Sequence, residues 1–254
     1  MQKYILKYIL YGGSQQQLEF DQIFIENEKI ISEIRDNYDI SSIHIIGKGP
    51  SAKYIKDKFA IGINEALIFT NYEFVLMNDL QSFFGIEHLI SNIKYIFVPY
   101  YIHVYHRPDE NFTYKDTLKY LDKHNFKGKV FVYFMTSSIP FLKKKNIINY
   151  NRYFFIDEYS AGTAVKIFNR FFNKAVIHIY GVNNGSGYHP IIAKICNDLY
   201  IQNNNKYPQN EYYKFYSFYK NYYTSNKHLY YSNDNVKDKT AKKINMFGVE
   251  LIKH

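Results

Sequence analysis

A continuous apolar run that ends in a glycine-rich turn limits the folds open to this chain. Residues 43–46 read Ile-His-Ile-Ile and lead directly into Gly47-Lys48-Gly49-Pro50-Ser51. Short apolar runs without alternation are typical of strands buried on both faces of a parallel sheet. Similar runs occur at residues 59–63, 73–77, 95–98, 129–134, 152–156, 176–180 and 228–231. Helical patterns precede the first run at about 20–34 and separate most of the others, at about 80–91, 114–124, 161–172, 189–201 and 210–222. Strands that alternate with helices predict an α/β fold with a mostly parallel sheet.

The whole chain is expected to form one domain. Neither an internal repeat nor a proline-rich linker divides the 254 residues, so we predict a single α/β domain over residues 1–254. The pattern is Rossmann-like, with helices on both faces of the sheet. The stretch 201–212 is rich in Gln, Asn and Lys. It is the most loop-like part, and we expect a small lid at about residues 184–215.

Charge and cysteine content restrict the partners and the compartment. The formal net charge is +9, but only four of the 32 basic residues are arginines. Reading of base edges relies on arginine, so no nucleic-acid partner is expected. The only cysteine, Cys196, excludes an intrachain disulfide, and no apolar window approaches the roughly 20 residues that span a bilayer. We expect a cytoplasmic protein. Peripheral contact with the cytoplasmic face of a membrane and a homo-oligomeric state stay open.

The turn at residues 47–51 is the strongest local signal for a ligand. Glycines after a strand let a ligand approach the backbone, and the following helix offers unpaired N–H groups to a phosphate. Pro50 suits a first helical turn because its missing N–H costs nothing there. The turn is not a Walker loop, and Tyr54 replaces the last glycine of Gly-x-Gly-x-x-Gly. A phosphate loop and an ordinary tight turn both stay open.

Polar residues follow three further predicted strands. These are Asn64 and Glu65, Asn78 and Asp79, and the segment Gly181-Val182-Asn183-Asn184. Open α/β sheets bind ligands at the carboxyl ends of their strands, and amides suit base and sugar edges because they donate and accept. Each pair alone is ordinary turn chemistry, whereas four polar strand ends along one edge favour a binding site.

A helix start adds to the same edge. The segment Ser160-Ala161-Gly162-Thr163 opens a predicted helix with Ser160 as its N-cap. Small residues at a helix start allow a ligand to sit close to the free N–H groups. A plain capped helix packed on the sheet is the alternative.

The order and spacing of these motifs resemble those of the bacterial sialyltransferases of glycosyltransferase family 42. They also resemble the related flagellar-modification and pterin pyrophosphokinase-like proteins. The matching positions are Gly47, Lys48, Gly49, Pro50, Ser51, Asn64, Glu65, Asn78, Ser160, Ala161, Gly162, Thr163, Gly181 and Asn183. The resemblance implies a variant of the glycosyltransferase-A fold. It further implies an inverting transfer of a sialic-acid-type sugar from a CMP donor to a glycan or glycolipid acceptor. The family needs no metal and no cofactor, and this chain has no Asp-x-Asp after a predicted strand and no His/Cys cluster with metal-ligand spacing.

The resemblance also implies two catalytic residues. A tyrosine bonds the leaving phosphate and a histidine deprotonates the acceptor hydroxyl, and Tyr188 and His189 are the candidates here. Lys48 and Glu65 replace family amides, and no histidine lies between His189 and His228 to match the family's lid base. A pterin pyrophosphokinase-like phosphotransferase and a catalytically inactive nucleotide-binding scaffold therefore stay open as alternatives.

Overall fold

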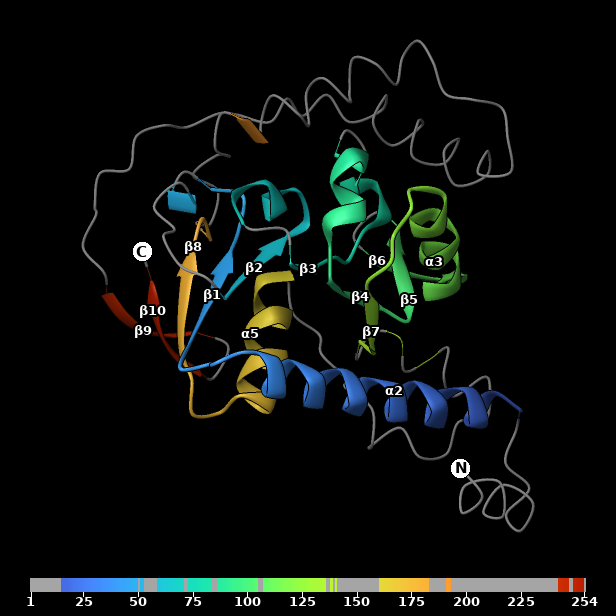
Figure 1. The fold of residues 1–254 in the computed structure, drawn as a ribbon, viewed down its shortest axis with the longest axis horizontal. Helices are drawn as coiled ribbons and strands as arrows, with labels where there is room; N and C mark the ends of the chain where they lie inside the picture. The colour runs from blue at the N-terminus through green and yellow to red at the C-terminus, as the bar shows by residue number, and fades with distance from the viewer. Residues whose placement is uncertain are drawn as a thin grey trace.

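The α/β architecture is confirmed by a computed structural model (Figure 1). It describes residues 15–49, 51–52, 59–70, 73–83, 86–104, 107–135, 138, 140, 160–182, 191–192, 242–246 and 249–253. Eight strands form one sheet in the order β7-β4-β3-β2-β1-β8-β10-β9. The first seven in this order run parallel, and β9 pairs antiparallel with β10. The strands are β1 (Ser42–Ile46), β2 (Ala60–Ile63), β3 (Phe74–Leu76), β4 (Tyr95–Pro99), β7 (Lys129–Tyr133), β8 (Val176–Tyr180), β9 (Lys242–Met246) and β10 (Val249–Lys253).

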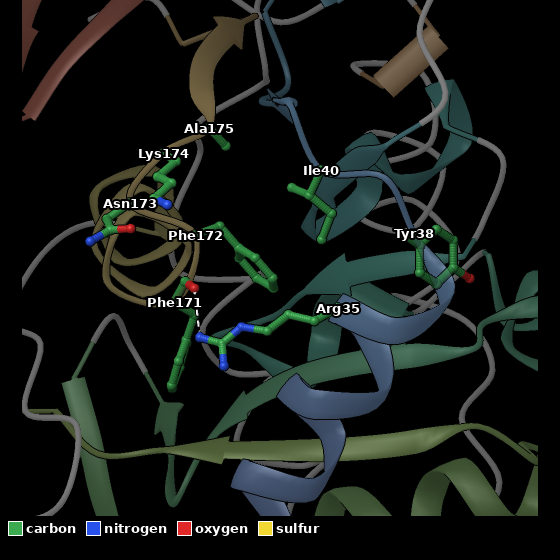
Figure 2. A pocket seen from close by; sticks show the side chains of 8 residues that line it. All are labelled: Arg35, Tyr38, Ile40, Phe171, Phe172, Asn173, Lys174 and Ala175. Carbon is green, nitrogen blue, oxygen red and sulfur yellow. Dashed lines mark hydrogen bonds between the residues drawn. The ribbon is translucent and has the colours of Figure 1, made fainter.

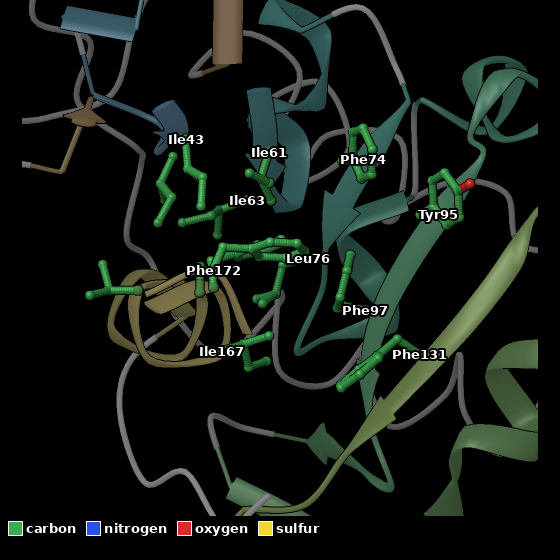
Figure 3. Packing of buried hydrophobic residues seen from close by; sticks show 14 of the residues in the cluster. Ile43, Ile61, Ile63, Phe74, Leu76, Tyr95, Phe97, Phe131, Ile167 and Phe172 are labelled. Atoms are coloured by element: carbon green, nitrogen blue, oxygen red, sulfur yellow. The ribbon is translucent and has the colours of Figure 1, made fainter. Parts of the chain in front are cut away.

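One face of the sheet is covered by two α-helices, α2 (Gln15–Asn37) and α5 (Ser160–Phe171). Figure 3 shows how the side chains of β1 to β4 and β7 pack against α5 in this layer. The layer is rich in rings, and Phe97 lies 5.0 Å from both Phe131 and Phe168, measured between centroids. Burying these large apolar side chains supplies much of the driving force for folding, about 1.5–3 kcal/mol for each fully buried ring or branched chain.

The opposite face is covered by shorter elements. They are the 3₁₀ helices η2 (Asn64–Phe69), η3 (Leu80–Phe83) and η4 (Glu87–Asn92), the hairpin β5 (Tyr101–Val104) and β6 (Arg107–Thr113), and the helix α3 (Tyr114–Lys123). They bury Phe83, Tyr120 and Leu121 against the β3, β4 and β7 side chains that point to this face. Helices therefore lie on both faces of the sheet, as the sequence predicts.

Helix α2 also closes the free edge of the sheet at β7. The side chain of Asn27 donates from Nδ2 to the carbonyl oxygen of Val132 at 2.7 Å and accepts from the Val132 N–H at 3.0 Å. Both Asn27 and Val132 are buried. An edge strand with free backbone groups invites pairing with other chains, so Asn27 takes the place of a neighbouring strand.

Two parts of the predicted pattern are wrong. The helix predicted at 80–91 is replaced by η3 and η4, and Gly85, a poor helix former, lies between them in the sequence. The β5–β6 hairpin, β9 and β10 are absent from the prediction. Pro108 in β6 and the lysines of β9 are unusual in central strands and typical of edge pairs.

Other predicted elements lie outside the described residues. These are the strands at 152–156 and 228–231, the helix at 210–222 and nearly all of the lid at 184–215. Of the helix predicted at 189–201, residues 191 and 192 are described, and both are helical. Among the described helices none is both long and apolar enough to cross a membrane.

Candidate functional site

The candidate site lies where the order of the strands changes direction. From the central strand β1 the chain adds β2, β3, β4 and β7 on one side, and β8 and β10 on the other. Ligands of open α/β sheets bind at such a switch point, outside the carboxyl ends of the strands. The loops after β1 and β8 meet at this point (Figure 1).

The glycines of these two loops are explained by contacts between the loops themselves. The N–H of Gly47 donates to the carbonyl of Tyr180 at 2.7 Å, and the N–H of Gly49 donates to that of Gly181 at 2.8 Å. Gly181 has a φ of +62°, and a Cβ atom there would lie 2.5 Å from the carbonyl oxygen of Gly47. A Cβ on Gly47 would in turn lie 2.6 Å from the Gly181 oxygen. The glycine pattern is therefore required by this close backbone approach, whether or not a ligand binds.

The hydroxyl of Ser51 belongs to the same junction. It accepts a 2.7 Å hydrogen bond from the N–H of Gly181, and both residues are buried. Ser51 thus joins the first loop to the loop after β8. In the structure this hydroxyl holds the two loops together, and its predicted contact with a ligand stays a prediction.

Charged side chains gather at the ends of β1, β2 and β3. Lys48 Nζ lies 3.1 Å from Glu65 Oε2 in a largely buried ion pair. Asp79 interacts electrostatically with both Lys48 and Glu65. Burial raises the pKa of the Asp79 carboxyl to about 7, against a lowering by Lys48 and with a further increase from Glu65. This group therefore changes its charge near neutral pH.

Two buried oxygen atoms at these strand ends have no hydrogen-bond partner within the described part of the chain. They are Oδ1 of Asn64 and Oδ1 of Asp79. Asn64 also has a φ of +54°, a left-handed conformation that asparagine tolerates better than most residues. Buried polar atoms without partners are rare in folded proteins, and strained backbone is often found at functional sites.

Asn78, in contrast, forms hydrogen bonds inside the protein through both Nδ2 and Oδ1. Its Nδ2 donates to Ser160 Oγ at 2.9 Å, and its Oδ1 accepts from the hydroxyl of Tyr133. Tyr133 is buried, and this burial together with the charge of Asp79 raises its pKa well above 10.0. Asn78 therefore positions the start of α5 against β3 and β7. The predicted contact of this amide with a ligand stays a prediction.

The start of α5 lies at the same edge because Asn78 follows β3 and bonds Ser160. Helix α5 begins at Ser160, so this residue is the first one inside the helix and its hydroxyl is bonded to Asn78. Ala161 is partly buried and Gly162 and Thr163 are buried. The hydrogen bond between Asn78 and Ser160 thus places the start of α5 beside the polar residues that follow β3.

Sequence reasoning missed Tyr133. It lies inside the strand predicted at 129–134, and the rule that singled out the other residues considers only those that follow a strand. Four predicted site residues, Pro50, Asn183, Tyr188 and His189, lie outside the described residues.

The opposite edge of the sheet holds a separate cavity of about 350 Å³ (Figure 2). It lies between the carboxyl ends of α2 and α5, and its lining includes Arg35, Tyr38, Phe172 and Lys174. Arg35 donates from Nη2 to the carbonyl of Phe171 at 2.8 Å, and its guanidinium lies 5.7 Å from the centroid of the Phe172 ring. A cation at a helix carboxyl end satisfies the free carbonyl groups there. Arg35 therefore joins the carboxyl end of α2 to that of α5.

Comparison with known proteins yields no relative for this chain: no family model, no curated protein and no solved structure matches it. The fold and the site define a class only. The class is a Rossmann-like α/β protein with a buried polar cluster at its switch point.

Proposed function

We propose that the carboxyl edge of the sheet binds a CMP-sugar and that the protein is a sialyltransferase-like glycosyltransferase. In this proposal a sialic-acid-type sugar passes to a glycan or glycolipid acceptor, with inversion and without a metal. The main support is the gathering of Lys48, Asn64, Glu65 and Asp79 at the switch point, with two buried oxygen atoms lacking partners. Leaving such a group unpaired costs about 1–3 kcal/mol, which a bound ligand would recover.

The proposed chemistry is a single displacement at the anomeric carbon of the donor sugar. The acceptor oxygen forms a bond to this carbon as the bond to the CMP phosphate oxygen breaks, and CMP leaves with the electron pair. His189 is the proposed base that takes the acceptor proton, and Tyr188 the proposed partner of the departing phosphate. The start of α5 suits the same phosphate, because helix starts favour anions through their N–H groups and dipole.

A thermal-shift titration with CMP, CDP, UDP, GDP and ATP, each with and without magnesium, tests the proposal. A ligand at 100 times its dissociation constant adds about 2.7 kcal/mol to stability. We expect stabilisation by CMP that is selective and independent of magnesium. Magnesium-dependent stabilisation by ATP would favour the pterin pyrophosphokinase-like alternative. CMP binding without turnover of CMP-sialic acid would favour the inactive scaffold, and no shift with any nucleotide would refute the nucleotide site.

The chain offers a matched pair of variants for this titration. Asn64 and Asn125 both have positive φ, at 54° and 59°, so Asn→Ala carries a similar backbone penalty at each. Asn64 is buried at the candidate site, whereas Asn125 is exposed after α3. We expect Asn64→Ala to weaken the stabilisation by CMP and Asn125→Ala to retain it. An equal loss of the CMP stabilisation in both variants would show that the loss comes from backbone strain and not from a missing contact with the ligand.

A further inference from the structure

The buried oxygen atoms at the ends of β2 and β3 indicate which hydrogen-bonding groups the ligand presents. This inference rests on the proposed nucleotide site. Asn64 is 6% exposed and Asp79 is 9% exposed, so bulk water does not solvate either side chain freely. Their unpartnered atoms are both oxygens. An amide oxygen and an ionised carboxylate can only accept hydrogen bonds. A group that satisfies Asn64 Oδ1 must therefore donate, and so must one that satisfies the ionised carboxylate of Asp79.

The position of Asn64 is held by the fold. A Cβ on Gly62 would lie 2.5 Å from the Cα of Leu67, so η2 folds back closely against β2. Asn64 sits at the turn between the two, in its left-handed conformation. Because β2 and β3 pair with Ile63 opposite Leu76, the residues after both strands emerge side by side. Asn64 and Asp79 therefore belong to one corner of the edge.

The charges in this corner disfavour a phosphate. Lys48 contributes one positive charge and is paired with Glu65 at 3.1 Å. Asp79 adds a second carboxylate, and in the described part of the chain it also interacts with the hydroxyl of Tyr133. Among the described residues, a phosphate placed here would meet the carboxylates of Glu65 and Asp79 and the ammonium group of Lys48. Like charges in a buried site repel strongly because little water screens them.

We propose that the ligand of this site presents hydrogen-bond donors, such as sugar hydroxyls or an amino group, to Asn64 and Asp79, and that its phosphate lies elsewhere on the edge. The ribose, the cytosine amino group and the transferred sugar of a CMP-sugar all carry such donors. The phosphate is then left for the start of α5. A donor to Asp79 stabilises the carboxylate, so binding of the ligand favours loss of the proton from this residue.

The pH dependence of ligand affinity distinguishes a site in which hydrogen-bond donors contact Asp79 from one in which a phosphate lies beside it. The pKa of Asp79 is about 7 without ligand. If donors contact the carboxylate, affinity rises with pH, by about tenfold between pH 6 and pH 8 when the bound carboxylate stays ionised throughout. If a phosphate lies beside Asp79, the bound state keeps the proton and affinity falls over the same range.

Calorimetric titration of CMP and cytidine at pH 6, 7 and 8 tests this for the wild type, Asp79→Asn and Glu73→Gln. Asp79→Asn keeps the shape and removes the charge. Glu73→Gln makes the same charge change at the opposite end of β3, where Glu73 pairs with Lys94. We expect Asp79→Asn to bind CMP about fivefold or more weakly at pH 8, because a charge-assisted hydrogen bond is lost, and to lose the rise with pH. Glu73→Gln should behave as the wild type.

Proton release by the wild-type protein provides a second measurement that needs no variant. Titration of cytidine, which has no phosphate, in buffers of different ionisation enthalpy at pH 7 should show net release of protons. Proton uptake, or tighter CMP binding by Asp79→Asn at pH 8, would overturn this inference and leave the nucleotide site standing. Absence of binding by both CMP and cytidine would overturn the inference and the proposed function together.

Discussion

The buried carboxyl of Asp79 predicts a large dependence of stability on pH in the protein without ligand. Its pKa is about 7 in the folded chain, against an ordinary value of 3.8. Between these values the folded state holds a proton that the unfolded state has released, so stability falls as pH rises from about 4 to 7 and is level above. At about 1.4 kcal/mol for each pH unit, the full loss is about 4 kcal/mol, of which about 3 kcal/mol falls between pH 5 and pH 8.

Replacing Asp79 by asparagine removes the titrating group and keeps the shape of the side chain. We expect Asp79→Asn to gain stability over the wild type as pH rises, with the difference growing by about 3 kcal/mol from pH 5 to pH 8. Urea unfolding followed by circular dichroism at pH 5, 6, 7 and 8 measures the difference. Glu73→Gln, at the opposite end of β3 from Asp79, serves as the control and should follow the wild type. Parallel pH profiles for Asp79→Asn and the wild type would refute the raised pKa.

Two further substitutions test the packing that supports the site. Asn27→Ala leaves the buried N–H and carbonyl of Val132 unpaired and should lower the free energy of unfolding by about 2–5 kcal/mol, and Asn27→Asp, which puts a buried carboxylate oxygen against the Val132 carbonyl, should cost at least as much near neutral pH. Urea denaturation of both variants measures the order, and an Asn27→Ala variant as stable as the wild type would contradict the edge contact. Gly181→Ala places a Cβ 2.5 Å from the Gly47 oxygen at a φ of +62°, so a loss of about 2–4 kcal/mol is expected by thermal unfolding. A neutral Gly181→Ala substitution would show that the two loops are not in contact.

Much of the sheet could be predicted because its strands are apolar on both faces. Runs such as 43–46 and 176–180 are mostly apolar without alternation, a pattern typical of strands in an α/β core. The edge elements could not be found in this way. Strand β9 has two lysines in five residues and β6 contains Pro108, because an edge strand needs no apolar face and gains from residues that discourage pairing with other chains.

The candidate site, too, could be predicted from the sequence only in part. That Lys48, Glu65 and Asp79 follow parallel strands is visible in the sequence, and parallel strands bring their carboxyl ends to one edge. Which of these side chains find partners is not visible, since the partners come from distant segments. Asn78 is bound by Tyr133 and Ser160, 55 and 82 residues away, while Asp79 beside it has an oxygen without a partner.

The sequence by itself determined the class of fold, the alternation of strands and helices and the edge at which polar residues collect, because these follow from local patterns of apolar and polar side chains. Only the tertiary structure decided the strand order and the reason for the glycines, which allow two backbone segments more than 130 residues apart to touch. It also decided which carboxylate is neutralised and which is left buried with a raised pKa. The partners of these side chains and their burial depend on contacts between segments that are far apart in the sequence. A local sequence pattern does not predict such contacts.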